Sequence, residues 1–306
     1  MDRFRYALVD GCACGCLVSI ADRPLIVHVL DELDRWGVEH TLVLTPVSRR
    51  DAVAGAIGPR PAVSYLDYGA PGENGALASR LRRTVSEDTL LVHPGDCLFP
   101  EQLACLAEHF GGARDDVALL FADGRAAALL GPEVWPRLGT LAPGELSTRD
   151  GLASLGVRAE ACKAREHWCY SDSTDELLTA NRMILDRLPT CAPSNESIEG
   201  STIAGRVCIS PTARISGSTL RGPVLVGDGA IVEDSFVGPY TSIGSDAKVA
   251  GAELDYSMVL AGAEIRHPGH RLEASVIEEL ASVSRSFTLP KGLHVRLGPG
   301  SRVVLG

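Results

Sequence analysis

The pattern of hydrophobic and polar positions changes once along the chain, near residue 190. Before that point, short apolar runs alternate with segments that carry apolar residues three or four positions apart, as between Leu25 and Trp36. Short apolar runs are typical of buried strands, and the longer spacing is typical of helices that cover a sheet. The alternation predicts an α/β domain over residues 1–188, with a mostly parallel, Rossmann-like sheet covered on both faces.

The predicted elements place candidate chemistry at one edge of this sheet. Ligand sites in such sheets lie at the carboxyl ends of the strands, so we expect residues 10–16 and Asp96 along the same edge. The predicted strands are Arg5–Val9, Thr41–Leu44, Ala62–Tyr65, Thr89–His93 and Val117–Phe121, and the predicted helices are Pro24–Trp36, Gly75–Val85 and Pro100–Phe110.

A different period begins after residue 198. One branched aliphatic residue recurs every five or six positions, with Gly, Ser, Asp and Pro between. This hexapeptide-type repeat predicts a left-handed parallel β-helix over residues 189–306, in which Pro189–Glu199 is the linker and about three or four coils of roughly 18 residues fit. The inward-pointing positions are expected to be Ile209, Ile215, Leu220, Val226, Val232, Val237, Ile243, Val249, Leu254, Val259 and Ile265.

Composition narrows the class of partner. The 306 residues are 45% hydrophobic and carry a net charge of −10, which argues against nucleic acid and anionic membranes as partners. No apolar run approaches the length of a bilayer span, and the first residues lack the hydrophobic region of a signal peptide. We therefore expect a cytoplasmic protein that binds a small molecule in its N-terminal cleft, with no nucleic-acid and no membrane partner.

The chain holds nine cysteines, and most of them are scattered. In a cytoplasmic protein, scattered cysteines are expected to be buried reduced thiols. The scattered set is Cys97, Cys105, Cys162, Cys169, Cys191 and Cys208.

Residues 9–16, Val-Asp-Gly-Cys-Ala-Cys-Gly-Cys, form the least usual stretch. A Gly-containing turn after a first strand is where many α/β proteins hold the phosphates of a nucleotide, but this turn has no Lys or Arg. In an extended chain, Cys12, Cys14 and Cys16 face one side, within reach of one metal ion or of one another. Three interpretations stay open: a metal site, reactive thiols with a lowered pKa, or small apolar residues that fill a shortened loop.

Several motifs of the chain resemble those of sugar-1-phosphate nucleotidyltransferases, in particular the long form of glucose-1-phosphate thymidylyltransferase. They are Asp22–Ile26, His93–Leu98, Gly144–Asp150, Trp168–Arg182, Arg221–Val224 and Val237–Gly244. The resemblance covers almost the whole chain, and it implies a truncated Rossmann-like nucleotidyltransferase domain followed by the β-helix. It also implies a reaction in which a sugar phosphate attacks the α-phosphate of a nucleoside triphosphate, with Mg²⁺ held by carboxylates.

The resemblance assigns roles to several residues, but some functional residues of the family have no counterpart in this sequence. Asp96 matches the family's first metal-binding aspartate, Tyr170 stands where the second is expected, and Asp172 lies two residues further on. Ser147 stands where the family has a sugar-contacting Glu, and neither lysine of the family's motifs has a counterpart, because no Lys occurs before Lys163. The residues expected to contact substrate are Gly11, Asp67, Tyr68, Gly72, Glu145, Ser147 and Trp168.

These departures leave three functions open. In the first, ordinary nucleotidyl transfer is lost and the old cleft carries other small-molecule chemistry on Asp96, Tyr170, Asp172 and the loop cysteines. In the second, the protein is a non-catalytic scaffold or regulator that pairs with an active homologue. In the third, it is a weak glucose-1-phosphate thymidylyltransferase. The cofactor stays open, with Mg²⁺ at Asp96 implied by the resemblance, and the flat faces of the β-helix predict a homo-oligomer.

Overall fold

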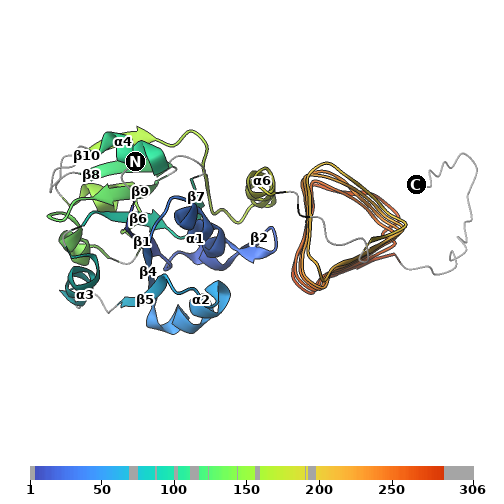
Figure 1. The fold of residues 1–306 in the computed structure, drawn as a ribbon, viewed down its shortest axis with the longest axis horizontal. Coiled ribbons are helices and arrows are strands. Elements are labelled where there is room, and N and C mark those ends of the chain that lie inside the picture. The colour runs from blue at the N-terminus through green and yellow to red at the C-terminus, as the bar shows by residue number, and fades with distance from the viewer. Residues whose placement is uncertain are drawn as a thin grey trace, which may run out of the picture.

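The protein folds into an α/β domain and a triangular coil of strands, with helix α6 (Thr174–Leu185) lying between them (Figure 1). The structure is a computed structural model, and it describes residues 4–68, 75–86, 88–99, 103–110, 117–122, 124–142, 144–155, 159–189, 191 and 198–285. Among these residues, no helix is both long and apolar enough to cross a membrane.

The α/β domain is built on a seven-stranded sheet with the strand order β10-β8-β9-β6-β1-β4-β5. Strand β1 pairs in parallel with β4 and β6, whereas β9 runs antiparallel to both β6 and β8. The sheet is therefore mostly parallel, as the alternating pattern predicts. Its strands are β1 (Tyr6–Asp10), β4 (His40–Pro46), β5 (Val63–Tyr68), β6 (Leu90–Pro94), β8 (Val117–Ala122), β9 (Arg125–Leu130) and β10 (Ala159–Lys163).

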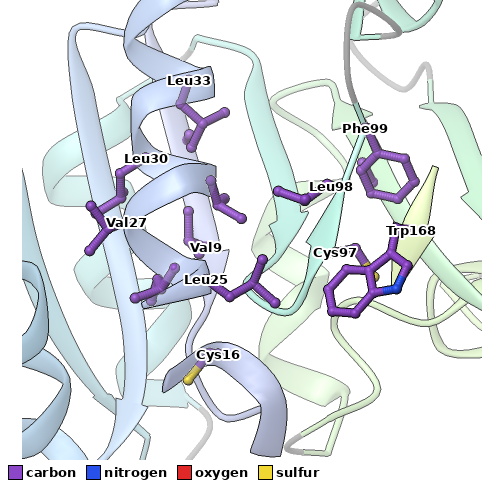
Figure 2. Close-up of a cluster of buried hydrophobic side chains, with 14 of the residues drawn as sticks. Val9, Cys16, Leu25, Val27, Leu30, Leu33, Cys97, Leu98, Phe99 and Trp168 are labelled. Atoms are coloured by element: carbon purple, nitrogen blue, oxygen red, sulfur yellow. The ribbon is translucent and has the colours of Figure 1, made fainter. Parts of the chain in front are cut away.

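Helices cover both faces of this sheet. On one face, α1 (Leu25–Arg35), α2 (Arg50–Ile57) and α4 (Leu103–His109) contribute to a cluster around Val9, and Figure 2 shows the side chains of α1 directed into it. The other face is covered by α3 (Gly75–Val85), the 3-10 helix η3 (Trp135–Thr140) and α5 (Arg149–Ala153). Because alternate residues of a strand point to opposite faces, β1 contributes to both clusters.

Short elements complete the domain around the candidate site. Two of them are antiparallel pairs: β2 (Ser19–Ile20) with β3 (Arg23–Pro24), and β7 (Cys97–Leu98) with β11 (Trp168–Cys169). The 3-10 helices η1 (Cys14–Leu17) and η2 (Val47–Arg49) follow strands β1 and β4. The hydrophobic pattern predicted none of these pieces, since two to four residues are too few to show a repeated period.

The C-terminal part is a parallel β-helix with three sheets of short strands. One sheet contains β12 (Ile198–Glu199), β15 (Arg214–Ser216), β18 (Ile231–Glu233), β21 (Lys248–Ala250), β24 (Glu264–Arg266) and β27 (Ser282–Ser284). A second contains β13 (Thr202–Ala204), β16 (Thr219–Arg221), β19 (Phe236–Val237), β22 (Glu253–Asp255) and β25 (Leu272–Glu273), and the third contains β14 (Val207–Ile209), β17 (Val224–Val226), β20 (Thr241–Ile243), β23 (Met258–Val259) and β26 (Val276–Ile277).

The aliphatic repeat forms the core of this coil. All the predicted inward positions from Ile209 to Ile265 are buried in one cluster. Five strands or more stack in each sheet, so the coil is longer than the three or four turns expected, because Leu272, Ile277 and Val283 continue the repeat as partly buried residues. The parallel β-helix is thus confirmed, and its left-handed sense stays a prediction.

The two parts are joined by a polar contact at the β2–β3 turn. Asp22 lies in this turn, and its carboxylate accepts hydrogen bonds from the Ser245 N–H at 2.6 Å and the Ser245 hydroxyl at 2.8 Å. A Cβ atom at Gly227 would lie 2.3 Å from Asp22 Oδ2, and one at Gly244 would lie 3.0 Å from Oδ1. Two glycines of the repeat therefore make room for a carboxylate of the α/β domain.

Candidate functional site

The carboxyl ends of β1 and β6 bring two aspartates to one edge of the sheet. Asp10 ends β1, and Asp96 follows β6 after Gly95. The Gly95 N–H donates to the Asp10 carbonyl at 3.0 Å, and a Cβ at Gly95 would lie only 2.5 Å from that oxygen. The sequence therefore placed residue 96 and the loop after β1 at the same edge correctly, although it did not single out Asp10.

Asp96 forms an ion pair inside the protein. Its Oδ2 lies 2.6 Å from Nη2 of Arg125, the first residue of β9. Asp96 is 2% exposed, and this burial raises the pKa of its carboxyl group, with the Arg125 guanidinium acting in the opposite direction and Asp10 in the same direction. A guanidinium therefore supplies the positive charge that this buried carboxylate requires.

The Asp10 carboxylate also accepts hydrogen bonds from other groups of the protein. Its Oδ1 accepts the Cys12 N–H at 3.0 Å, and its Oδ2 accepts the Ser147 hydroxyl at 2.8 Å. Asp10 is 1% exposed and Ser147 is fully buried. Ser147 was expected to contact substrate, but its hydroxyl holds Asp10 instead. The signal that could have identified Asp10 is a charged residue at the end of an otherwise apolar strand, because such a charge is seldom buried without partners.

The loop after β1 is compact rather than extended. The Gly11 N–H donates to the Leu44 carbonyl at 2.8 Å, and a Cβ at Gly11 would lie 2.9 Å from that oxygen, so Gly11 serves backbone packing. Residues 14–17 then form η1. Cys12 packs against the cluster on one face of the sheet, and Cys16 belongs to the cluster on the other, as Figure 2 shows for Cys16 below Leu25.

The two described thiols are not activated by this setting. Burial raises the pKa of Cys12 above its ordinary value and raises that of Cys16 to about 11. The direction is opposite to the lowered pKa expected of reactive thiols. Cys12 and Cys16 also do not share one side of the chain, which was the premise of the metal hypothesis. The side chain of Cys14 lies outside the described residues.

A guanidinium from a neighbouring strand end reaches this loop. Arg49, at the end of η2, donates through Nη1 to the carbonyls of Cys12 at 3.2 Å and Ala13 at 3.3 Å. Its Nη2 lies 3.8 Å from the Cys16 sulfur. The loop therefore has a basic neighbour that the local sequence does not contain, and this neighbour is bound to backbone carbonyls.

Tyr170 packs against the same loop. A Cβ at Gly15 would lie 2.1 Å from Tyr170 Cγ, so the ring lies directly against the Gly15 backbone. The Tyr170 N–H donates to the Asp96 carbonyl at 2.9 Å, and the ring meets the buried Trp168 edge to face at 6.5 Å. Trp168, expected to contact substrate, is a core residue next to the site.

A disulfide ties the strands that carry these groups. Cys97 and Cys169 stand opposite each other in the β7–β11 pair and are bonded. The expectation of reduced thiols is wrong for these two residues, because the pairing of β7 with β11 is a long-range contact that spacing does not reveal. Cys105, Cys191 and Cys208 are half-buried and form no disulfide, and the side chain of Cys162 lies outside the described residues.

Tyr170 and Asp172 line a cleft between the two parts of the protein. Its volume is about 270 Å³. Ser19 of the α/β domain and Glu279 of the β-helix both line it, and the Ser19 hydroxyl donates to Glu279 at 3.2 Å. The β-helix adds apolar side chains such as Met258. The two candidate residues therefore share a cleft, and Asp96 does not line it.

The remaining predicted contact residues are engaged within the chain. Asp67 pairs with Arg50 at 2.9 Å, and the Tyr68 hydroxyl donates to the Leu141 carbonyl at 2.6 Å. Burial raises the pKa of Tyr68 to about 12. Glu145 is exposed and accepts the Ala142 N–H at 2.8 Å. Gly72 lies outside the described residues.

Comparison with known proteins shows which enzymes the chain resembles. Residues 15–165 match the MobA-like NTP transferase domain. The chain is 28% identical over 163 residues to a glucose-1-phosphate thymidylyltransferase of Streptomyces antibioticus, covering 52% of this chain and 45% of that protein. A second such enzyme, of Streptomyces griseus, is 25% identical over 331 residues, covering 94% and 92%. Over almost its whole length, the chain is therefore similar to sugar-1-phosphate nucleotidyltransferases.

Other relatives lie further away. The low-salt glycan biosynthesis nucleotidyltransferase Agl11 of Haloferax volcanii is 24% identical, covering 94% of this chain and 93% of that protein. Among solved structures, a 4-diphosphocytidyl-2C-methyl-D-erythritol synthase has a TM-score of 0.44 at 21% identity, covering 58% of this chain and 97% of its own. A putative glucose-1-phosphate thymidylyltransferase from Bacillus anthracis, in complex with a sucrose, has a TM-score of 0.40 at 14% identity, covering 54% and 88%.

The side chains of this protein do not fit the Mg²⁺ site that the resemblance to these enzymes implies. A hard cation needs several oxygen ligands that are free to coordinate it. Asp96 holds a guanidinium, and both oxygens of Asp10 accept hydrogen bonds. Within the described ranges, no group of three or more His, Cys, Asp or Glu side chains is arranged to hold a metal ion. The structure therefore gives no basis for a metal-dependent step at Asp96.

Proposed function

We propose that this protein is a non-catalytic member of the nucleotidyltransferase family and serves as a scaffold or regulatory subunit beside an active homologue in sugar-nucleotide biosynthesis. The observation that carries the proposal is the Asp96–Arg125 ion pair, with Asp96 buried and Nη2 of Arg125 at 2.6 Å. Nucleotidyl transfer depends on cations placed around the reacting phosphate and on carboxylates that hold Mg²⁺. Here the carboxylate at the family's metal position is neutralised by the protein itself.

The other groups near this edge support the same proposal. Arg49 is bound to carbonyls of the loop, and Tyr170 lies against Gly15. The Cys12 and Cys16 thiols have raised pKa values because they are buried, so they stay protonated at neutral pH. Loss of one preorganised charge contact alone commonly reduces a rate by about 10² to 10³.

A pyrophosphate-release assay tests the loss of activity. Purified protein is incubated with glucose 1-phosphate, Mg²⁺ and each of dTTP and UTP, with the Streptomyces griseus relative as positive control. We expect no release above that of the Asp96→Asn variant. Mg²⁺-dependent release that disappears in Asp96→Asn would overturn the proposal and support a weak thymidylyltransferase.

The scaffold role has its own test. The full chain is mixed with an active homologue from the same pathway, and the molar mass of the eluted species is measured by light scattering. We expect a mixed complex and a changed rate of the homologue. Separate elution together with an unchanged rate contradicts the scaffold role. The same measurement on the protein alone tests the predicted homo-oligomer.

A second candidate function is small-molecule chemistry in the Tyr170 cleft. It is favoured by one observation, the convergence of Tyr170 and Asp172 on a cleft that the β-helix closes with Glu278 and Glu279. Its test is the Tyr170→Phe, Asp172→Asn double variant in the producing cell. Loss of the pathway product with the protein still folded supports this function, and unchanged product excludes it.

A further inference from the structure

A separate groove lies between α1 and the C-terminal end of α6. Its volume is about 410 Å³, and none of its lining residues lines the Tyr170 cleft. Leu98, Met183, Ile184 and Leu188 give it apolar walls. Pockets of this size bind small molecules when a few polar groups converge on an apolar surface.

One of those polar groups is a buried carboxylate that lacks a full set of partners. Glu32 is 5% exposed, and its Oε1 has no hydrogen-bond partner among the described residues. The carboxylate accepts the Phe99 N–H, and burial raises the pKa of Glu32 to about 7. The neighbouring His28 makes no hydrogen bond to Glu32 Oε1, and the Nε2 atom of this histidine lies 2.8 Å from the Ile20 carbonyl oxygen. An unsatisfied buried acceptor is costly, so a donor from a ligand is favoured here.

Two guanidinium groups lie at the mouth of the same groove. Arg35 and Arg187 are exposed, and both act on Glu32 by lowering its pKa against the effect of burial. Within the described part of the chain, neither forms an ion pair with a carboxylate, whereas Asp31 and Asp34 are both paired with Arg60. Asp31 and Asp34 also line the groove, but their ion pairs are not with Arg35 or Arg187, so the mouth keeps two guanidinium groups for an anion.

We infer that this groove binds a hydroxylated anion of monosaccharide size, such as a sugar phosphate or a sugar acid. A ligand hydroxyl donates to Glu32, and the anionic group pairs with Arg35 and Arg187. The apolar walls pack against the carbon–hydrogen face of the ligand. The site is independent of the Asp96–Arg125 pair, and it goes beyond the proposed scaffold function because it adds a small-molecule ligand that no active cleft requires.

Calorimetric titration of the full chain tests this assignment. The probes are glucose 6-phosphate and gluconate, with glucose and inorganic phosphate as the two halves of the expected ligand. We expect glucose 6-phosphate or gluconate to bind at least about tenfold more tightly than either half, since both ends of the ligand contribute. If glucose 6-phosphate binds more tightly, the site prefers a phosphate group. If gluconate binds more tightly, it prefers a carboxylate.

Three variants locate the binding. Glu32→Gln and Arg187→Ala each weaken the affinity by about tenfold or more, because the first replaces a carboxyl acceptor with an amide and the second removes a charge-assisted contact, whereas Asp96→Asn leaves it unchanged. Glu32→Gln removes a buried ionisable group and is expected to fold, which circular dichroism checks. No binding by either anion at 10 mM (roughly the weakest useful affinity), or binding that survives both groove variants, overturns the inference. Loss of binding in Asp96→Asn alone places the ligand at the sheet edge and also overturns it.

Discussion

Arg125 and Asp96 form an ion pair of 2.6 Å in which the two partners are unequally exposed: the Asp96 side chain is 3% exposed, and that of Arg125 is 29% exposed. The carboxylate has little contact with water and depends on the guanidinium. The guanidinium keeps part of its hydration and depends less on the carboxylate. Removal of the guanidinium is therefore expected to lower the free energy of unfolding more than removal of the carboxylate.

We predict that Arg125→Ala lowers the free energy of unfolding by about 2–4 kcal/mol, because it leaves a buried carboxylate without its partner. Asp96→Asn costs less, about 1 kcal/mol, because Arg125 is partly solvated. Urea unfolding measures both. The exposed Arg5–Glu39 pair is the control, and Glu39→Gln is expected to leave the free energy of unfolding nearly unchanged. A larger cost for Asp96→Asn than for Arg125→Ala contradicts the assignment.

Gly15 is predicted to be intolerant of any side chain. A Cβ there would lie 2.1 Å from Tyr170 Cγ, so Gly15→Ala must displace the ring and costs about 1–3 kcal/mol. Gly55→Ala is the matched control, since nothing lies within 4 Å of its added Cβ in helix α2, and it is expected to be neutral or stabilising. In a double-mutant cycle, Tyr170→Ala removes most of the cost of Gly15→Ala.

The Asp22–Ser245 contact is predicted to hold the β-helix against the α/β domain. Asp22→Ala loses two hydrogen bonds at a residue with φ of 66°, and we expect a loss of about 1–3 kcal/mol. Asp22→Asn costs less, because asparagine tolerates this backbone region and keeps one acceptor oxygen. Calorimetry is expected to show the two parts unfolding at more separate temperatures in Asp22→Ala. A thermogram of Asp22→Ala that equals that of the natural protein contradicts this prediction.

His93 makes stability depend on pH in the acidic range. Burial lowers the pKa of this fully buried histidine from 6.5 to about 4, so between these values the unfolded chain binds a proton that the folded chain does not. Stability from this group is complete above about pH 6.5 and is lost as the pH falls towards 4. We expect His93→Asn to flatten that slope by about 1–3 kcal/mol over this range. An unchanged slope, measured by urea unfolding at several pH values, contradicts the prediction.

Glu32 has the opposite dependence. Burial raises its pKa from 4.5 to about 7, so the folded state holds a proton that the unfolded state releases between these values. Stability is lost as the pH rises through this window. Glu32→Gln is therefore expected to be more stable than the natural protein at pH 8 by about 1–3 kcal/mol and about equal at pH 4.5. Glu108→Gln, at an exposed position of α4, is the control without such a difference.

The sequence predicted the elements whose signal is local and periodic. The helix expected at Gly75–Val85 is α3 with the same bounds, and the aliphatic repeat is the core of the β-helix. Helix α2 escaped the pattern because only Val53 and Ile57 of it are buried, which is too few to mark a period. Strand β9 escaped because its neighbours β6 and β8 run antiparallel to it, which breaks the expected alternation.

By itself, the sequence determined the two architectures, the family motifs and the edge of the sheet where the candidate site lies, because periodicity and strand order depend on neighbours along the chain. Only the tertiary structure decided the state of that site. Arg125 reaches Asp96, Arg49 reaches the loop after β1, and Tyr170 covers Gly15, and each of these contacts joins segments far apart in sequence. A carboxylate's chemistry depends on its partners and its hydration, and both are set by contacts that no local pattern encodes.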